Sequence, residues 1–171
     1  MSTDLPESID AWRAVAARRI YAGEVGLHRF ARLAESLADC SGSCRFELTF
    51  EQDQFGAATV QIRAEAELPL TCQRTLERFL LPVQIRQTLG LLRRESDESG
   101  LPNDVEPLLV PADGELKPVE LVEDELILAL PVVPISPGSS EVDVQTADPG
   151  DAEETRPNPF AALAALKKQS S

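Results

Sequence analysis

The most constraining feature of the sequence is an alternation of apolar and polar residues that begins at position 58 and whose apolar set continues to position 72. The even positions carry Ala, Val, Ile, Leu and finally Cys72, whereas the odd positions from Thr59 to Glu67 are polar or charged. Successive side chains of a strand point to opposite faces, so this period predicts a long strand with one dry and one wet face. The chain must therefore build a sheet that buries only one of its faces.

Two neighbouring segments carry the same alternation. CRFELTFEQ (44–52) precedes the long strand, and residues 52–56 form the predicted hairpin turn between the two. TLERFLLPVQIRQTLGLL (75–92) follows it, with Pro82 expected at an edge or a bulge because proline lacks a backbone N–H. We predict an antiparallel β-meander of three or more strands, and the pattern leaves open whether the sheet closes into a barrel.

The N-terminal residues predict helices that accompany this sheet. DAWRAVAARR (10–19) is typical of a short helix with Asp10 as its N-cap and arginines near its negative pole. Gly23 and Gly26 then indicate a connection, and LHRFARLAESLA (27–38) predicts a second helix with an apolar face. The fold class expected from strands and helices together is α+β.

The second half of the chain predicts one further helix and several acidic loops. Apolar residues at helical spacing predict an acidic helix near 118–130. We expect residues 1–134 to form a single α+β domain with an acidic mobile loop at about 93–116. An acidic flexible linker is expected at 135–157, and a C-terminal docking helix at 158–168. The docking helix is identified by its N-cap, its first-turn proline and its apolar stripe, which are Asn158, Pro159, Phe160 and Leu163.

Charge is distributed unevenly along the chain, whose formal net charge is -13. Residues 1–94 are neutral in sum, residues 95–154 carry -16, and residues 155–171 carry +3. The acidic part would repel a phosphate backbone and suits a basic partner such as a ribosomal protein. The basic residues of the predicted N-terminal helices are Arg13, Arg18, Arg19, Arg29 and Arg32.

Each charged group has two interpretations. The arginines form either two solvated helix faces or a contact for RNA or another partner. The carboxylates of the acidic helix form either a solvated face or a contact for a basic protein, and they are Glu120, Glu123, Asp124 and Glu125. Consecutive helical carboxylates point in different directions, so they do not predict a cation site.

Recognisable catalytic and cofactor motifs are absent from the sequence. The single histidine, His28, is expected on a solvated face, and no glycine-rich phosphate loop occurs. Cys40 and Cys44 are expected to be small buried apolar residues. We therefore expect no enzyme, no metal, no cofactor and no small-molecule substrate. The acidic N-terminus lacks a signal-peptide pattern, and no apolar run is long enough for a membrane span, so we expect a cytoplasmic protein.

Three segments together resemble the YceD family of bacterial and plastid proteins. They are LTCQR (70–74), EDELILALPVVP (123–134) and RPNPFAALAALKK (156–168). The family is needed for accumulation of the 23S RNA of the large ribosomal subunit. The resemblance therefore implies a role in making or protecting that subunit, and no known catalytic activity.

The chain departs from this family at a position that concerns metal binding. Many relatives carry Cys-x-x-Cys at the place of Cys72 to Thr75, with a further His or Cys after the segment that matches LALPVVP. Here Thr75 replaces the second sulfur, and ISPGSSEVDV (135–144) contains neither His nor Cys. A structural zinc usually needs four ligands, so we carry over no metal site. Cys72 is instead expected to continue the apolar face of the long strand.

Three functions are compatible with these observations. The first is a non-enzymatic ribosome-assembly factor that contacts 23S RNA or its precursor. The second is a protein–protein adaptor or chaperone for a basic large-subunit ribosomal protein, without RNA contact. The third is a hydrolase or nuclease, which the spacing of the carboxylates does not support.

Overall fold

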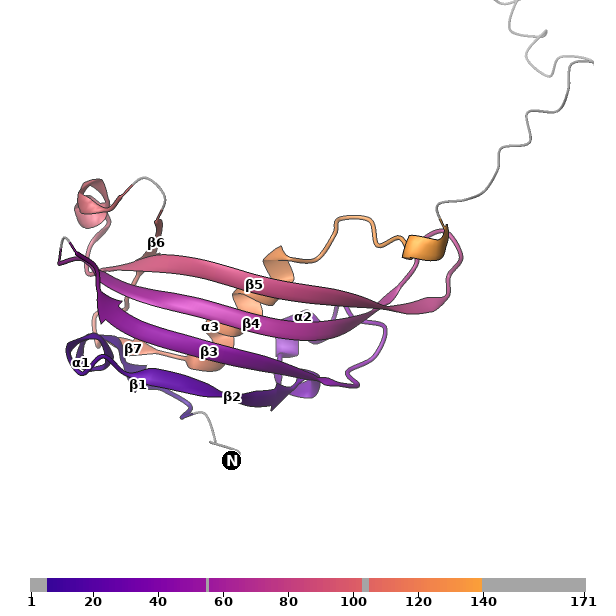
Figure 1. The fold of residues 1–171 in the computed structure, drawn as a ribbon, viewed down its shortest axis with the longest axis horizontal. Coiled ribbons are helices and arrows are strands. Elements are labelled where there is room, and N and C mark those ends of the chain that lie inside the picture. The colour runs from indigo at the N-terminus through magenta and orange to yellow at the C-terminus, as the bar shows by residue number, and fades with distance from the viewer. Residues whose placement is uncertain (1–5, 55, 103–104, 140–171) are drawn as a thin grey trace, which may run out of the picture. The chain divides into compact units, whose positions relative to one another are not determined.

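The alternating segments form the centre of a five-stranded sheet (Figure 1). The computed structural model describes residues 6–54, 56–102 and 105–139. In chain order the elements, with η for a 3-10 turn, are β1 (Ile9–Asp10), α1 (Ala11–Ala16), β2 (Ile20–Gly26), η1 (Leu27–Arg29), α2 (Ala31–Ala34), β3 (Ser43–Gln52), β4 (Ala58–Thr71), β5 (Arg78–Leu92), η2 (Glu95–Gly100), β6 (Glu106–Leu109), β7 (Glu115–Leu116), α3 (Pro118–Leu128) and η3 (Pro137–Ser139). All of these elements belong to one compact unit, Met1–Ser140.

The strand order in the sheet is β2-β3-β4-β5-β6, and β1 pairs separately with β7. The predicted antiparallel meander is confirmed by β3, β4 and β5. β6 adds to β5 in the parallel direction, which the sequence did not indicate. Since β2 and β6 occupy the two edges, closure into a barrel is not confirmed.

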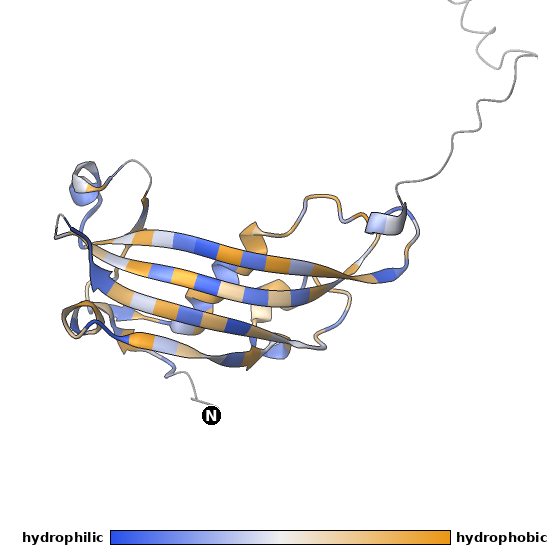
Figure 2. Cartoon of the chain, viewed as in Figure 1, coloured by the Kyte–Doolittle hydropathy of each residue, from blue (hydrophilic) through white to orange (hydrophobic). Residues whose placement is uncertain are grey.

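The sheet has the predicted dry and wet faces, and Figure 2 shows the resulting stripes along β3, β4 and β5. Ile62 of β4 lies opposite Leu48 of β3, and both side chains are fully buried. Arg63, one residue later, is exposed opposite Glu47. The helices α2 and α3 lie on the dry face (Figure 1). Pro82 lies where β5 has β4 as its only strand neighbour, as expected for a residue without an N–H.

The helix α1 begins as predicted and ends earlier than predicted. The Asp10 carboxylate accepts the N–H of Arg13 at 2.9 Å, which confirms Asp10 as the N-cap. After Ala16 the chain turns through Arg18, whose φ of 48° is left-handed. The N–H of Arg19 then donates to the carbonyl of Ala14 at 2.9 Å. Together with the N–H of Arg18 donating to Val15, this bond closes the helix as a Schellman motif.

Two predictions for the following residues were wrong. The connection expected around Gly23 and Gly26 instead belongs to the edge strand β2, which pairs with β3 along its whole length. The sequence of β2 shows no alternation of apolar and polar residues, because Val25 is the only residue of this strand that is buried. Residues 27–38, expected to be one helix, form η1 and the short α2. The helix is interrupted at Phe30, which has φ -91° and ψ 89° while its ring is fully buried.

The later segments also differ in detail from the prediction. Residues 93–116, predicted as a mobile loop, contain η2, β6 and β7. The acidic helix is confirmed as α3, which starts at Pro118 and buries Leu121, Val122 and Leu126. The predicted docking helix at 158–168, and the predicted linker from residue 140 onward, lie outside the described residues.

Candidate partner-binding surfaces

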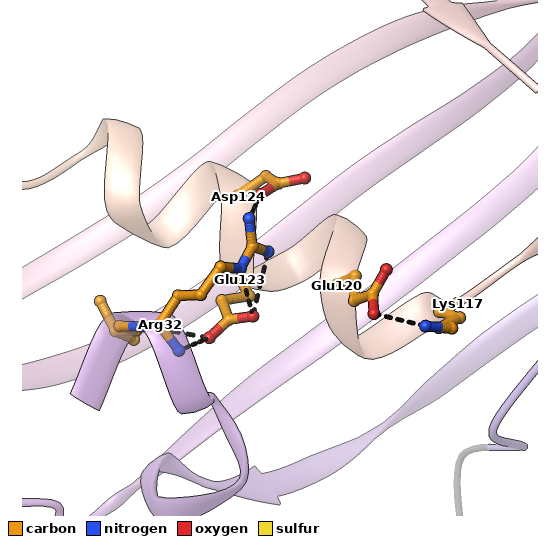
Figure 3. Close-up of polar contacts among 6 residues, drawn as sticks. Arg32, Lys117, Glu120, Glu123 and Asp124 are labelled. Carbon is orange, nitrogen blue, oxygen red and sulfur yellow. Dashed lines mark hydrogen bonds and ion pairs between the residues drawn. The ribbon is translucent and has the colours of Figure 1, made fainter. Parts of the chain in front are cut away.

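Glu123, predicted to face solvent, lies inside the junction between α2 and α3 (Figure 3). Its residue exposure is 4%, so that prediction was wrong. The carboxylate atom Oε1 accepts the backbone N–H of Arg32 at 2.7 Å and that of Leu33 at 3.1 Å. Position 123 is four residues after Val119 and three before Leu126, which places it on the buried stripe of the helix. Glu123 thus caps the first turn of α2 from another element.

The Arg32 side chain completes this junction. Its Nε and Nη2 donate to Oε2 of Glu123 at 3.1 and 3.0 Å, and its Nη1 pairs with Oδ1 of Asp124 at 2.7 Å. The carboxylates of Asp124 and then Glu123 raise the pKa of the Arg32 guanidinium. The structure therefore brings one predicted RNA contact together with two predicted acidic contacts. The charge of Arg32 is balanced within the chain, although 54% of its side chain is exposed.

The remaining carboxylates of α3 face outward to different degrees. Glu120 accepts a hydrogen bond from Lys117 Nζ at 2.8 Å (Figure 3). Glu125 is half-buried, and its pKa is raised first by that burial and then by the charges of Glu106 and Asp124. A cation brought to this face would relieve the repulsion between the like charges. The predicted acidic contact is thus reduced to Glu120, Asp124 and Glu125.

The five predicted basic residues do not form one patch. β2 separates Arg19, which precedes it, from Arg29, which follows it. A strand of seven residues extends over about 20 Å, because each residue rises about 3.3 Å. Arg29 and Arg32 therefore lie at the end of the sheet beside α2, whereas Arg13, Arg18 and Arg19 lie at the α1 end.

Sequence reasoning missed two arginines at the α1 end. The antiparallel register pairs Gly90 with Thr59 at the start of β4, so β5 ends beside α1. The Arg93 guanidinium lies 3.9 Å from the ring centroid of Trp12, and Arg94 pairs with Asp97 at 3.2 Å. The consecutive arginines immediately before the acidic segment were a usable signal. Their proximity to α1 was not, because it depends on the sheet register.

Two hollows flank α1. The first, about 650 Å³, is lined by Arg13, Arg19 and Tyr21 among others. The second, about 400 Å³, is lined by Trp12, Arg93, Asp97 and their neighbours. The only tryptophan and the only tyrosine of the chain therefore border these hollows. A larger hollow of about 820 Å³ lies on the wet face of the sheet, where Arg45 and Arg63 alternate with Glu24, Glu47 and Glu65.

The cysteines and the histidine occupy three different environments. Cys44 is buried as predicted, and burial raises the pKa of its thiol to about 12. Cys40 is only half-buried. His28 is exposed, as predicted. Within residues 6–54, 56–102 and 105–139, no three His, Cys, Asp or Glu side chains form a group that could hold a metal ion. The expected absence of a metal site stays a prediction.

Cys72, which directly follows β4, is fully buried, as predicted. Its Sγ accepts the backbone N–H of Ser136 at 3.4 Å. The N–H of Gln73 donates to the carbonyl of Pro134 at 2.9 Å. These bonds fasten the turn between β4 and β5 to the segment that follows α3.

This fastened turn carries a group of exposed apolar side chains, which we call the hairpin-tip patch and define as Leu76, Val132, Val133 and Ile135. Leu76 has a left-handed φ of 59° and is 77% exposed, and Val132 is 97% exposed. Isolated apolar side chains on a surface are common, whereas several large ones on two joined segments are candidates for a contact site.

The chain is similar to proteins named for a role in ribosomal RNA accumulation. Residues 60–167 match the family model described as large ribosomal RNA subunit accumulation protein YceD. The protein of that name from Haemophilus influenzae is 31% identical over 169 residues, which cover 96% of this chain and 97% of the relative. No solved structure matches the chain. None of the described helices is long and apolar enough to cross a membrane.

Proposed function

Because the chain belongs to the YceD family of large ribosomal RNA subunit accumulation proteins, we propose that it is a non-catalytic ribosome biogenesis factor. Its role is to support the accumulation of 23S ribosomal RNA in the cytoplasm. The observation that carries the proposal is the similarity, over nearly the full length of both chains, to a relative named for this role.

The arrangement of charges supports direct contact with 23S RNA or its precursor at the α1 end. Arg13, Arg18 and Arg19 are exposed there, and no ion pair engages them within the described residues. We do not include Arg32 among the proposed RNA contacts, because its guanidinium is paired with Glu123 and Asp124. The carboxylates of α3 repel phosphates, which limits indiscriminate binding of RNA elsewhere on the surface.

Deletion of the gene tests this function. We expect a lower ratio of 23S to 16S RNA and a deficit of large subunits in a sucrose gradient. Expression of the wild-type chain in the deletion strain should restore both measurements. An unchanged ratio together with a normal subunit profile would overturn the proposal.

The hairpin-tip patch favours a second candidate function, that of an adaptor or chaperone for a basic large-subunit ribosomal protein. The patch would contact apolar residues of that protein, and Glu120 and Glu125 would attract its cations. The predicted docking helix at 158–168 would add a peptide anchor through Phe160 and Leu163.

Affinity capture of the tagged chain separates the two candidates. Val132→Asp places a charge on the patch, and Ala112→Asp places the same charge on an exposed loop as the matched control. The adaptor function is supported if the captured ribosomal protein survives nuclease treatment and is lost only in Val132→Asp. It is contradicted if nuclease removes the partner from every variant.

A further inference from the structure

The α1 end of the sheet gathers cationic side chains from two distant parts of the sequence. Arg13, Arg18 and Arg19 come from α1 and its C-terminal turn, and Arg93 comes from the end of β5. All four side chains are exposed, and none forms an ion pair with another described residue. Uncompensated cations grouped around aromatic side chains are the usual composition of a surface that binds single-stranded nucleic acid.

Trp12 holds the Arg93 side chain in a defined position. The guanidinium lies over the indole ring, with 3.9 Å between its central carbon and the ring centroid. The backbone of Gly114 packs close to the indole, because a Cβ at Gly114 would lie only 3.2 Å from the Cδ1 atom of Trp12. Gly114 has a left-handed φ of 79°, which favours glycine, and its carbonyl accepts the N–H of Ala11 at 2.9 Å.

Arg93 is exposed beside Trp12, so its guanidinium remains accessible to a ligand from solvent. A flat cation that is already positioned costs less side-chain entropy when a ligand binds to it. RNA-binding proteins stack bases on arginine planes as well as on aromatic rings. The adjacent hollow of about 400 Å³ lies within the range of small-ligand pockets, roughly 300–1,000 Å³.

We propose that the α1 end binds single-stranded RNA, with a base stacked on the guanidinium of Arg93 and phosphates held by Arg13 and Arg19. The inference rests on the proposed function, because it assigns RNA as the partner of the same arginines. The hollow lined by Arg13, Arg19 and Tyr21 lies on the other side of α1, so neighbouring nucleotides would straddle the helix.

Carboxylates at this end determine which form of RNA fits. Asp10 accepts the N–H of Arg13, Asp53 accepts that of Ala57, and Asp97 pairs with Arg94. These acidic side chains lie among the arginines and interrupt the long continuous cationic track that duplex RNA requires. A single strand that presents its bases needs few phosphate contacts, and the two proposed for Arg13 and Arg19 give a salt slope of only about -1.4 at about -0.7 each.

The experiment uses the fluorescence of Trp12, the only tryptophan of the full chain. The purified protein is titrated with a short single-stranded oligoadenylate, and then with duplex RNA of the same length. We expect quenching and tighter binding with the single strand. Arg93→Ala should weaken that binding about tenfold, because the variant loses the surface on which one base stacks. Arg93→Lys keeps the charge but not the plane, and should fall between Arg93→Ala and wild type.

Arg86→Ala is the matched control, since it removes one exposed cation from the middle of the sheet. The inference is overturned if Arg86→Ala weakens binding as much as Arg93→Ala, or if duplex RNA binds as tightly as the single strand. Such a result would leave the deletion phenotype, and with it the proposed function, untouched. A normal 23S to 16S ratio in the deletion strain would instead contradict the proposed function alone.

Discussion

Arg32 and Arg93 are both held by partners within the chain, and the two partners differ in a way that matters for function. Arg32 lies at the junction of α2 and α3, where Glu123 and Asp124 neutralise its charge. Arg93 lies at the α1 end on the neutral ring of Trp12. A carboxylate fixes the side chain and cancels its field, whereas an aromatic ring fixes it and leaves the charge available to a third group. The first arrangement stabilises the fold, and the second prepares a binding surface.

The largest loss of stability is expected from replacing Glu123, which holds Arg32 in place. Replacing it by alanine leaves the N–H groups of Arg32 and Leu33 without their acceptor, and the guanidinium without its buried carboxylate. We expect the free energy of unfolding to fall by about 2–3 kcal/mol, as for other losses of hydrogen bonds to a charged group. Urea unfolding followed by circular dichroism measures the change.

Asp124→Ala is the control for that variant, because Asp124 is exposed and its ion pair with Arg32 is the only ion pair it forms with a described residue. It should shift the urea midpoint much less, as exposed ion pairs contribute little. Equal shifts for the two variants would mean that the cap on α2 contributes nothing beyond an ordinary surface pair.

The second prediction compares two variants, each of which removes one of the two arginines. Arg32→Met leaves the carboxylate of Glu123 buried beside an uncharged side chain, so the melting temperature should fall while the affinity for single-stranded RNA stays within about twofold of wild type. Arg93→Ala should show the reverse pattern, with a weaker affinity and a nearly unchanged melting temperature. Calorimetry and the fluorescence titration measure the two quantities. If both variants lose affinity equally, the distinction between the two regions is wrong.

The sequence predicted the elements whose signal is local. The alternation from Val60 to Leu70 is a property of consecutive residues, and β4 is where it was expected. The cap at Asp10 and the helix α3 were found for the same reason. β2 carries no alternating pattern because an edge strand buries little, so its hydrogen bonds to β3, rather than its side chains, hold it in place.

The candidate sites depended on contacts that no local pattern reveals. Glu123 reaches Arg32 across 91 residues of sequence, and its position on the helix placed it in the buried stripe. Trp12 meets Arg93 only because the register of β4 and β5 brings the end of β5 to α1. Charge counting therefore found the correct residue types at the N-terminus but could not distinguish cations that stabilise the fold from those that remain available.

A smaller effect is expected at Arg18, which belongs to the available group. Its left-handed φ of 48° is unfavourable for a residue with a Cβ, and glycine is the usual residue there. Arg18→Gly should raise the free energy of unfolding by about 0.5–1 kcal/mol while weakening RNA binding through the loss of one cation. Leu76→Gly relieves the same strain at φ 59° in the β4–β5 turn. It should raise stability without affecting RNA affinity, and an equal loss of affinity in both would remove Arg18 from the RNA surface.

The smallest effect concerns Arg78, a third arginine, which is paired on the surface. Its Nε donates to Oδ2 of Asp39 at 2.5 Å, and its Nη2 donates to Ser41 Oγ at 2.9 Å. The Arg78 guanidinium, followed by the hydrogen bonds from Ser41, holds the pKa of Asp39 well below its ordinary value. A carboxyl whose pKa is lower in the folded chain stabilises the fold above the unfolded pKa of about 3.9, and this stabilisation is lost as the pH falls further.

Asp39→Asn tests how an exposed carboxylate pair compares with the buried one. The wild type should have a slightly higher urea midpoint than the variant at pH 6, and the difference should shrink progressively below about pH 4 as Asp39 becomes protonated. A difference that persists unchanged at low pH would show that the contact is held by its neutral hydrogen bonds. Arg78 would then resemble neither Arg32 nor Arg93. Its contribution to stability would come from neutral hydrogen bonds and not from its charge, which a carboxylate cancels at Arg32 and an aromatic ring leaves available at Arg93.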